Sequence, residues 1–207
     1  MDDCLNKCGL LIVLSGPSGV GKDTVLKKLR EKLPGMCLSV SMTTRSMRQG
    51  EVDGVNYIFT DFGDFEKKIG QGFFLEYAKY GTNYYGTPKA TFESWLARGK
   101  VVFLKIEVQG AEKVRSEFAE SVSVFLTTPT FADLICRLKA RKSECEEDIL
   151  RRVNIAKSEI TRANEYDYIV INDEVERAAE DICAIVRAER LKYKNMKKYV
   201  DEVINNA

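Results

Sequence analysis

Residues Gly16 to Lys22 have the types and the spacing of a loop that binds phosphate groups. They read Gly-Pro-Ser-Gly-Val-Gly-Lys, follow an apolar run at 10–14 and precede a segment with helical spacing of apolar residues. Glycines let backbone N–H groups converge on phosphate oxygens without a Cβ in the way, and the start of a helix attracts the same anion. The lysine adds a mobile cation. We predict that this loop and the two residues after it bind a nucleotide through Gly16, Pro17, Ser18, Gly19, Val20, Gly21, Lys22, Asp23 and Thr24.

The residue after the loop lysine departs from the usual pattern of such loops. That position normally holds Ser or Thr, whose hydroxyl meets Mg²⁺. Here it is Asp23, and Thr24 comes next. The phosphate site is unaffected, but its metal arrangement must differ. We predict that Asp23 lies on the Mg²⁺ side of the nucleotide.

A phosphate loop is shared by GTPases, motors and kinases, so the second substrate must be sought elsewhere in the chain. Arg45 and Arg48 lie three residues apart and can grip a phosphate with bidentate guanidinium groups. Tyr57 and Tyr85 carry hydroxyls that can donate to the same oxygens. These residues predict a second, separate phosphate site.

Composition excludes several classes of protein. The 207 residues carry 32 Lys and Arg against 31 Asp and Glu, a net charge of +1 that argues against broad nucleic-acid binding. Histidine is absent, which removes histidine catalysis and histidine metal sites. The six cysteines form no CxxC pair, and the apolar run at 10–14 is too short to span a membrane. We expect a cytoplasmic protein with reduced thiols.

Apolar runs alternate with segments of helical spacing, a pattern typical of an α/β protein with a parallel sheet. The segment 41–90 interrupts the alternation with tyrosines, glycines and short β-like runs, and we interpret it as an inserted lobe. Segment 137–152 is a second, arginine-rich insert. The predicted strands are 10–14, 101–106, 122–126 and 168–171, and the predicted helices are 23–33, 111–118, 131–140, 148–164 and a long helix from 175.

Four further segments, together with the phosphate loop, resemble the guanylate kinase family in order and spacing, from about Gly9 to Arg190. They are 39–59, 73–88, 103–110 and 166–173. The resemblance implies a three-layer P-loop kinase fold with a parallel central sheet, an inserted mixed β/α lobe that binds GMP, and a short arginine-rich lid. It places the core at 9–40, 91–136 and 153–190, the lobe at 41–90, the lid at 137–152 and a helical tail at 191–207.

The resemblance also implies an activity: transfer of the γ-phosphoryl group of ATP to GMP, with Mg²⁺, giving ADP and GDP. The partners are then these two nucleotides, with no nucleic acid and no membrane. By family pattern, the GMP phosphate is bound by Arg45, Arg48, Tyr57 and Tyr85, and the base by Glu76, Glu107, Ser41 and Thr87. The catalytic residues are Lys22, Arg45 and three lid arginines, Arg137, Arg141 and Arg152, while Asn172 lies near the ATP adenine.

The chemistry of guanine agrees with the two glutamates. Guanine presents N1–H and N2–H₂ as donors, whereas adenine presents a lone pair at N1, which a carboxylate repels. Sites built on such pairing can reject the wrong partner by about 10⁴–10⁵-fold. Glu107 is a departure, because the family usually carries Asp there.

Lys105 is a second departure, because the family usually has an acid near the end of that strand. This strand end lies close to the residue after the P-loop lysine in P-loop folds. One position has therefore lost a carboxylate and the other, Asp23, has gained one. We hypothesise that the changes compensate, with Lys105 orienting Asp23. If Lys105 pointed away, the pairing would not exist.

Two other functions compete with the kinase. A non-catalytic guanylate-kinase-like module that binds phosphopeptides typically loses the phosphate loop, which is complete here. A kinase for another phosphorylated acceptor, such as a sugar phosphate, would have no use for Glu76 and Glu107.

Overall fold

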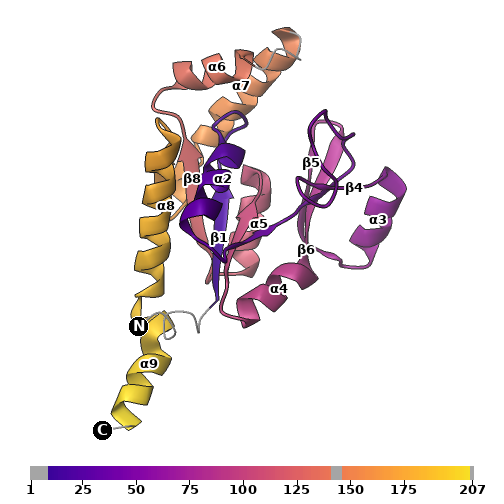
Figure 1. The fold of residues 1–207 in the computed structure, drawn as a ribbon. Coiled ribbons are helices and arrows are strands. Elements are labelled where there is room, and N and C mark those ends of the chain that lie inside the picture. The colour runs from indigo at the N-terminus through magenta and orange to yellow at the C-terminus, as the bar shows by residue number, and fades with distance from the viewer. Residues whose placement is uncertain (1–8, 141–145, 206–207) are drawn as a thin grey trace.

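A five-stranded parallel sheet forms the centre of the molecule (Figure 1). The computed structural model describes residues 9–140 and 146–205. The strand order is β2-β7-β1-β8-β9. Strand β1 lies in the middle and is buried along its whole length, as expected for an apolar strand covered on both faces. The strands are β1 Leu10–Ser15, β2 Cys37–Ser39, β7 Val101–Lys105, β8 Val122–Thr127 and β9 Tyr168–Ile171.

Helices cover both faces of this sheet, and side chains of β1 alternate between the two layers. Ile12 and Leu14 pack in a cluster with residues of α2 (Lys22–Lys32) and α8 (Val175–Arg190). Leu11 and Val13 pack in a second cluster with residues of α4 (Lys89–Ala97) and α5 (Val108–Glu117). The predicted three-layer α/β core with a parallel sheet is therefore confirmed.

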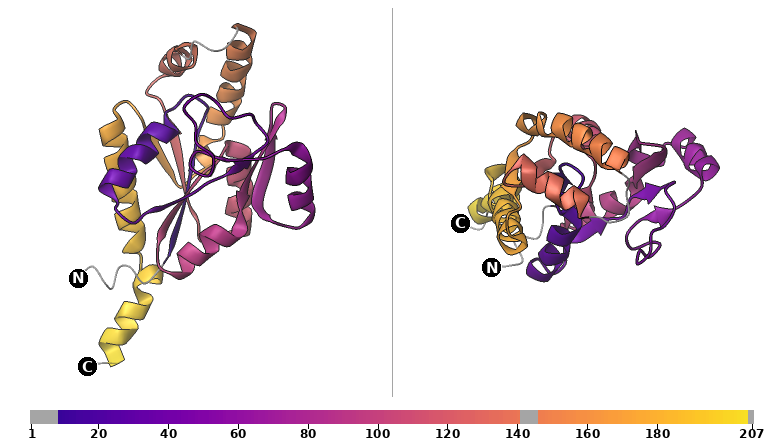
Figure 2. Two further views of the ribbon diagram at one scale, coloured as in Figure 1. Left: turned by 45° about the vertical axis from the view of Figure 1, so that its right-hand side comes forward. Right: turned by 90° about the horizontal axis from the view of Figure 1, so that it is seen from above.

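A separate mixed sheet lies beside the core, as Figure 2 shows. Its order is β4-β3-β6-β5, with β3 parallel to β4 and antiparallel to β6. Helix α3 (Phe62–Gly70) packs on it through Phe65, whose ring stacks on Phe74 and Tyr84 at centroid distances of 4.4 and 5.3 Å. The predicted inserted lobe with a mixed sheet is confirmed. The strands are β3 Met42–Thr43, β4 Ile58–Phe59, β5 Phe74–Tyr80 and β6 Asn83–Pro88.

Two predicted helix boundaries were wrong by several residues. Helix α5 begins at Val108, not 111, because Glu107 is its N-cap residue and the glycine at 110 is accommodated within the first turn. Helix α7 spans Glu146–Ile160, and a short 3₁₀ turn at Ala163–Glu165 replaces the end of the predicted helix 148–164.

The remaining helices stand at opposite ends of the molecule. Helix α6 (Phe131–Lys139) begins with a capping box formed by Thr130 and Asp133, and it stands with α7 at the same end as the phosphate loop (Figure 2). Helix α9 (Tyr193–Asn205) extends from the other end and has no buried residue. No helix in 9–140 or 146–205 is long and apolar enough to cross a membrane. The three cysteines within these ranges, Cys37, Cys136 and Cys183, are free thiols.

Candidate active site

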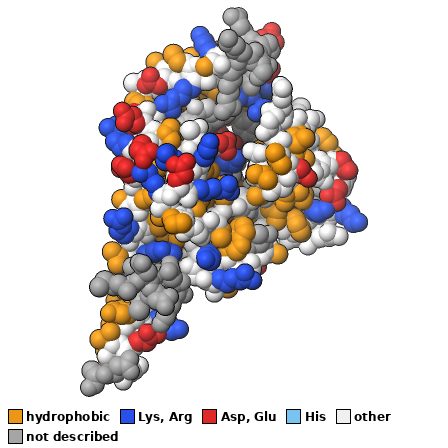
Figure 3. Space-filling view, viewed as in Figure 1, with side chains coloured by type: hydrophobic (Ala, Val, Ile, Leu, Met, Phe, Trp, Pro, Cys, Tyr) orange, Lys and Arg blue, Asp and Glu red, His pale blue; other side chains and the backbone are white. Residues whose placement is uncertain are grey.

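A cleft lies between the carboxyl ends of the central strands and the mixed sheet, where ligands bind in open α/β folds. Figure 3 shows this face hollowed between the two parts, with charged side chains at its border. The predicted site residues that line the cleft are Pro17, Ser18, Gly19, Gly21, Lys22, Asp23, Thr24, Ser41, Arg45, Arg48, Tyr57, Glu76, Tyr85, Glu107 and Arg152. Five other predicted residues are not among those that line it: Gly16, Val20, Thr87, Arg137 and Asn172. Arg141 lies outside the described residues.

Backbone conformation and close packing both require glycine at positions 16 and 21 of the phosphate loop. Gly16 and Gly21 have φ of 138° and 93°, a region that side chains rarely adopt. A Cβ at Gly16 would lie 2.1 Å from the carbonyl oxygen of Leu126, and one at Gly21 would lie 2.6 Å from Nδ2 of Asn172. The loop backbone is therefore packed directly against its support.

Lys22 lies over this loop and reaches the acceptor side. Its Nζ donates to the carbonyl oxygens of Gly16 and Pro17, the second at 3.2 Å. The same Nζ lies 3.8 Å from Oε2 of Glu107. The ammonium therefore lies at the boundary between the phosphate loop and the predicted base pocket.

Asn172 and Arg137 hold the loop from behind. Nδ2 of Asn172 donates to the carbonyl oxygen of Val20 at 2.7 Å, and the Asn172 side chain is buried. Arg137 donates to the carbonyl oxygens of Asn172 (2.8 Å) and Val20 (3.4 Å). The two residues were predicted from the sequence as nucleotide contacts, and here they position the loop backbone.

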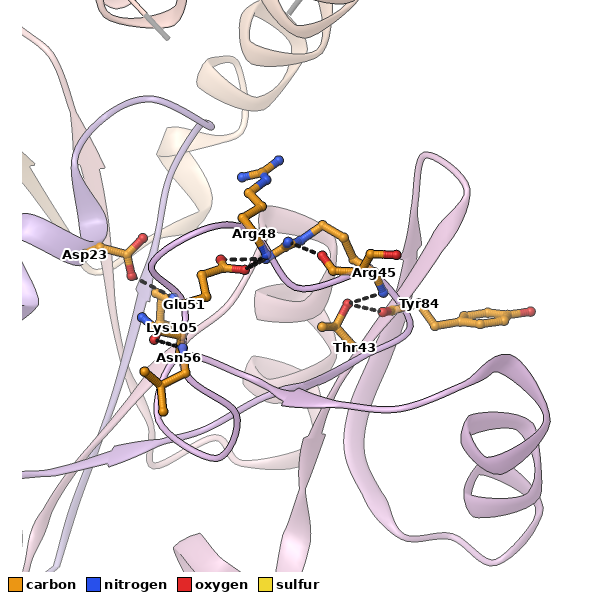
Figure 4. Close-up of polar contacts among 10 residues, drawn as sticks. Asp23, Thr43, Arg45, Arg48, Glu51, Asn56, Tyr84 and Lys105 are labelled. Atoms are coloured by element: carbon orange, nitrogen blue, oxygen red, sulfur yellow. Dashed lines mark hydrogen bonds and ion pairs between the residues drawn. The ribbon is translucent and has the colours of Figure 1, made fainter. Parts of the chain in front are cut away.

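Arg45 is held by an acid that the sequence analysis missed. Its Nη2 donates to both oxygens of Glu51, at 2.7 and 3.0 Å, and Oε2 of Glu51 also accepts from the backbone N–H of Arg48 at 2.8 Å (Figure 4). Burial is the largest single effect and would raise the pKa of Glu51, but the hydrogen bonds and charges of Arg45 and Arg48 together outweigh it, so the pKa is lowered. The Arg45 guanidinium also lies over the Tyr57 ring, 5.4 Å from its centroid. The position of Glu51, six residues after Arg45, was the sequence feature that could have indicated this partner.

Glu76 is a buried carboxyl group at the end of the cleft. It is 5% exposed, and its Oε1 accepts a hydrogen bond of 2.7 Å from the hydroxyl of Thr87, its cross-strand partner. Burial raises the pKa of Glu76 to about 7, although the Thr87 bond and Lys113 oppose this. A Cβ at Gly110 would lie 2.6 Å from Oε2 of Glu76, so α5 needs glycine here. Gly110 was also missed by the sequence analysis.

Two further carboxylates, Glu107 in the cleft and Glu159 on α7, lie close enough for their charges to interact. Oε2 of Glu107 is buried and makes no hydrogen bond within the described chain, and the same holds for Oε2 of Glu159 on α7. Burial raises the pKa of Glu159 to about 7, with Glu107 adding to the effect and Lys22 opposing it. Glu107 therefore offers the cleft a buried acceptor that makes no hydrogen bond within the described chain, with Lys22 3.8 Å away, and such an acceptor suits a ligand that brings N–H groups.

Lys105 and Asp23 form the ion pair that the sequence analysis anticipated. Nζ of Lys105 lies 2.7 Å from Oδ1 of Asp23 (Figure 4). The same Nζ lies 4.7 Å from the centroid of the Tyr57 ring. Lys105 thus connects the first turn after the phosphate loop with a tyrosine of the second phosphate site.

The guanylate kinase family model matches residues 9–189. The chain belongs to the guanylate kinase family. It is 44% identical over 198 residues to guanylate kinase of Oceanobacillus iheyensis, with 96% of both chains covered. It is 52% identical over 184 residues to guanylate kinase of Halalkalibacterium halodurans, covering 89% of this chain and 90% of that protein.

A solved guanylate kinase has the same fold. The crystal structure from Anaplasma phagocytophilum is 34% identical and superposes with a TM-score of 0.77, covering 90% of this chain and 88% of that one. The family assignment and the geometry agree: a complete phosphate loop and a buried acidic pocket face one cleft.

Proposed function

We propose that the protein transfers the γ-phosphoryl group of ATP to GMP, giving ADP and GDP. One observation carries this proposal: the phosphate loop faces the buried carboxyl of Glu76 across a single cleft. A loop alone fits any nucleotide phosphate, whereas a buried acceptor in the same cleft selects a base with N–H donors.

On the donor side, the ATP phosphates lie along the loop from Gly16 to Gly21, with Lys22 moving from the loop carbonyls to the phosphate oxygens. Val20 has a fully buried side chain, so its contribution is through the backbone. Asn172 supports this backbone near the adenine side. The lid residues Arg137, Arg141 and Arg152 close over the transferring group, where an arginine can contribute roughly 10³–10⁵ in rate.

On the acceptor side, the GMP phosphate binds Arg45 and Arg48 with the hydroxyls of Tyr57 and Tyr85. Since Glu51 already holds Arg45 through both oxygens, the incoming phosphate meets an oriented guanidinium. The base binds against Ser41, Thr87, Glu76 and Glu107. The acceptor oxygen is already anionic, so the reaction needs no general base.

Mg²⁺ fits this site as a partner of the nucleotide. The described residues contain no group of three or more His, Cys, Asp or Glu that could hold a metal. Asp23 is 80% exposed in its side chain and is adjacent to Thr24, a donor set that suits Mg²⁺ carried mainly by phosphates and water. When bound, Mg²⁺ neutralises charge on the β- and γ-phosphates. Asp23 and Thr24 would hold it from the protein side, with Asp23 also paired with Lys105.

The organisation we propose follows these roles: a core at 9–40, 91–136 and 153–190, a GMP-binding lobe at 41–90, a lid at 137–152 and a tail at 191–207. The complete phosphate loop and the buried Glu76 disfavour both the phosphopeptide-binding module and a sugar-phosphate acceptor.

The test follows the γ-phosphoryl group from ATP to the acceptor. The protein is incubated with Mg²⁺ and ATP labelled at the γ-phosphate, with GMP as acceptor. We expect the label in GDP, and none in GDP for Lys22→Met. Label released only as inorganic phosphate would refute the proposal.

A further inference from the structure

Lys105 occupies a position between the two phosphate sites. It is the last residue of β7 and lies opposite Leu14 of β1 in the sheet, so its side chain leaves the sheet beside the start of the phosphate loop. Its side chain lines the cleft and is 13% exposed. The ammonium contacts Asp23 on the donor side (Figure 4). It also faces the Tyr57 ring on the acceptor side, 4.7 Å from the ring centroid.

This lysine carries its charged group in a mostly buried position beside Asp23. Holding a cation in a mostly buried position costs free energy unless a partner is present. Asp23 is 80% exposed, and a pair with one exposed member contributes little to stability. The arrangement is therefore poorly explained as a structural contact.

We propose that Lys105 is a catalytic residue whose ammonium contacts the phosphoryl group as it passes between the two nucleotides, with Asp23 as its positioning residue. This inference rests on the proposed function. In the transfer, the bond between the γ-phosphorus and the β–γ bridging oxygen breaks, and its electron pair stays on ADP. A GMP phosphate oxygen forms the new bond to phosphorus, and no proton moves.

The ammonium stabilises the negative charge that develops during this step. The three non-bridging oxygens of the transferring group carry negative charge in the transition state. A cation already oriented by Asp23 stabilises them without reorganising at the moment of reaction. Because Lys105 and Asp23 carry opposite charges, the pair is neutral, and Asp23 does not repel the phosphates on its own.

Steady-state kinetics with Mg²⁺, ATP and GMP test the proposal in Lys105→Met, Lys105→Arg and Asp23→Asn. We expect kcat of Lys105→Met to fall about 10²-fold, the size of losing one oriented donor, with KM for GMP nearly unchanged. Lys105→Arg restores part of kcat, and Asp23→Asn loses less than Lys105→Met. The matched control is Lys32→Met, which removes a lysine paired with Glu176 and Glu180 between α2 and α8 and leaves kcat unchanged.

A binding measurement separates catalysis from structure. Calorimetry follows GMP binding alone, and again with ADP, Mg²⁺ and aluminium fluoride, which stands in for the planar phosphoryl group. We expect Lys105→Met to weaken only the second complex, with a thermal melting temperature near that of the wild type. If the methionine variant does not fold, Lys105→Gln takes its place.

Two results would overturn the inference: kcat of Lys105→Met within about threefold of the wild type, or equal weakening of both complexes, which would make Lys105 an ordinary substrate-binding group. A wild-type protein that makes no GDP would instead refute the proposed function itself. The two failures are therefore distinguishable.

Discussion

Replacing Glu76 by glutamine measures two effects of its carboxylate separately: how much the charge lowers the stability of the fold, and how much it contributes to recognition of the base. The substitution keeps the shape of the side chain and removes its charge. In the folded protein burial holds the pKa of Glu76 at about 7, against an ordinary value of 4.5. The folded state therefore disfavours the ionised form, so ionisation lowers the free energy of unfolding. This loss is absent well below pH 4.5, grows as pH rises towards 7 and is complete above it.

The size of the effect follows from the two pKa values. Their difference corresponds to about 3 kcal/mol at pH 8 and less than about 1 kcal/mol at pH 5. We expect Glu76→Gln to be more stable than the wild type by up to about 3 kcal/mol at pH 8, less whatever its buried amide loses by incomplete hydrogen bonding. At the same time, kcat/KM for GMP should fall at least about 10²-fold, because the amide N–H₂ faces the donors of guanine.

Urea denaturation at pH 5 and pH 8 measures the first effect, and steady-state kinetics the second. Glu66→Gln, at an exposed position of α3, is the matched control and should change neither stability nor kinetics. A stability difference between Glu76→Gln and the wild type that is the same at both pH values would refute the electrostatic reasoning.

Three further substitutions test the support of the site. Gly110→Ala places a Cβ 2.6 Å from Oε2 of Glu76 and should raise KM for GMP at least about tenfold; unchanged KM in steady-state kinetics would contradict it. Asn172→Ala removes the 2.7 Å bond to Val20 and should weaken ATP binding in calorimetry while leaving GMP binding intact; equal loss of both would argue against a local role. Phe65→Ala empties the core of the mixed sheet and should lower the unfolding free energy by about 3–5 kcal/mol in urea, and a loss below about 1 kcal/mol would contradict its packing.

Four of the five strands of the central sheet were predictable because they are apolar and separated by segments of helical spacing. Strand β2 (Cys37–Ser39), only three residues long, was not predicted. The run at 10–14 and the strand at 168–171 were placed almost to the residue. Helix starts were less certain. Helix α5 begins at Val108 after the N-cap residue Glu107, which makes no side-chain capping bond, and it has a glycine at 110 in its first turn; neither residue is typical of a helix start.

The site was predictable to the extent that a local motif carries it. The phosphate loop and the lining residues Arg45, Tyr57 and Glu76 could be named from spacing and family resemblance. Glu51, Gly110 and Glu159 could not, because their roles depend on which side chains the fold brings beside them. An exposed and a buried glutamate look alike in a sequence.

Likewise, the sequence could suggest that Lys105 and Asp23 compensate each other, but only the register of β7 against β1 brings the two side chains to 2.7 Å. Asn172 and Arg137 make contacts that the sequence did not suggest. Their segments match nucleotide-binding motifs, whereas their side chains bond to the backbone of the loop.

The most direct test of the account compares GMP and AMP as acceptors at matched concentrations of MgATP. A pocket built around the buried carboxyl of Glu76 predicts a kcat/KM ratio of about 10⁴ or more in favour of GMP. Folded protein that turns over both monophosphates at similar rates would contradict the claim that this carboxyl reads the base.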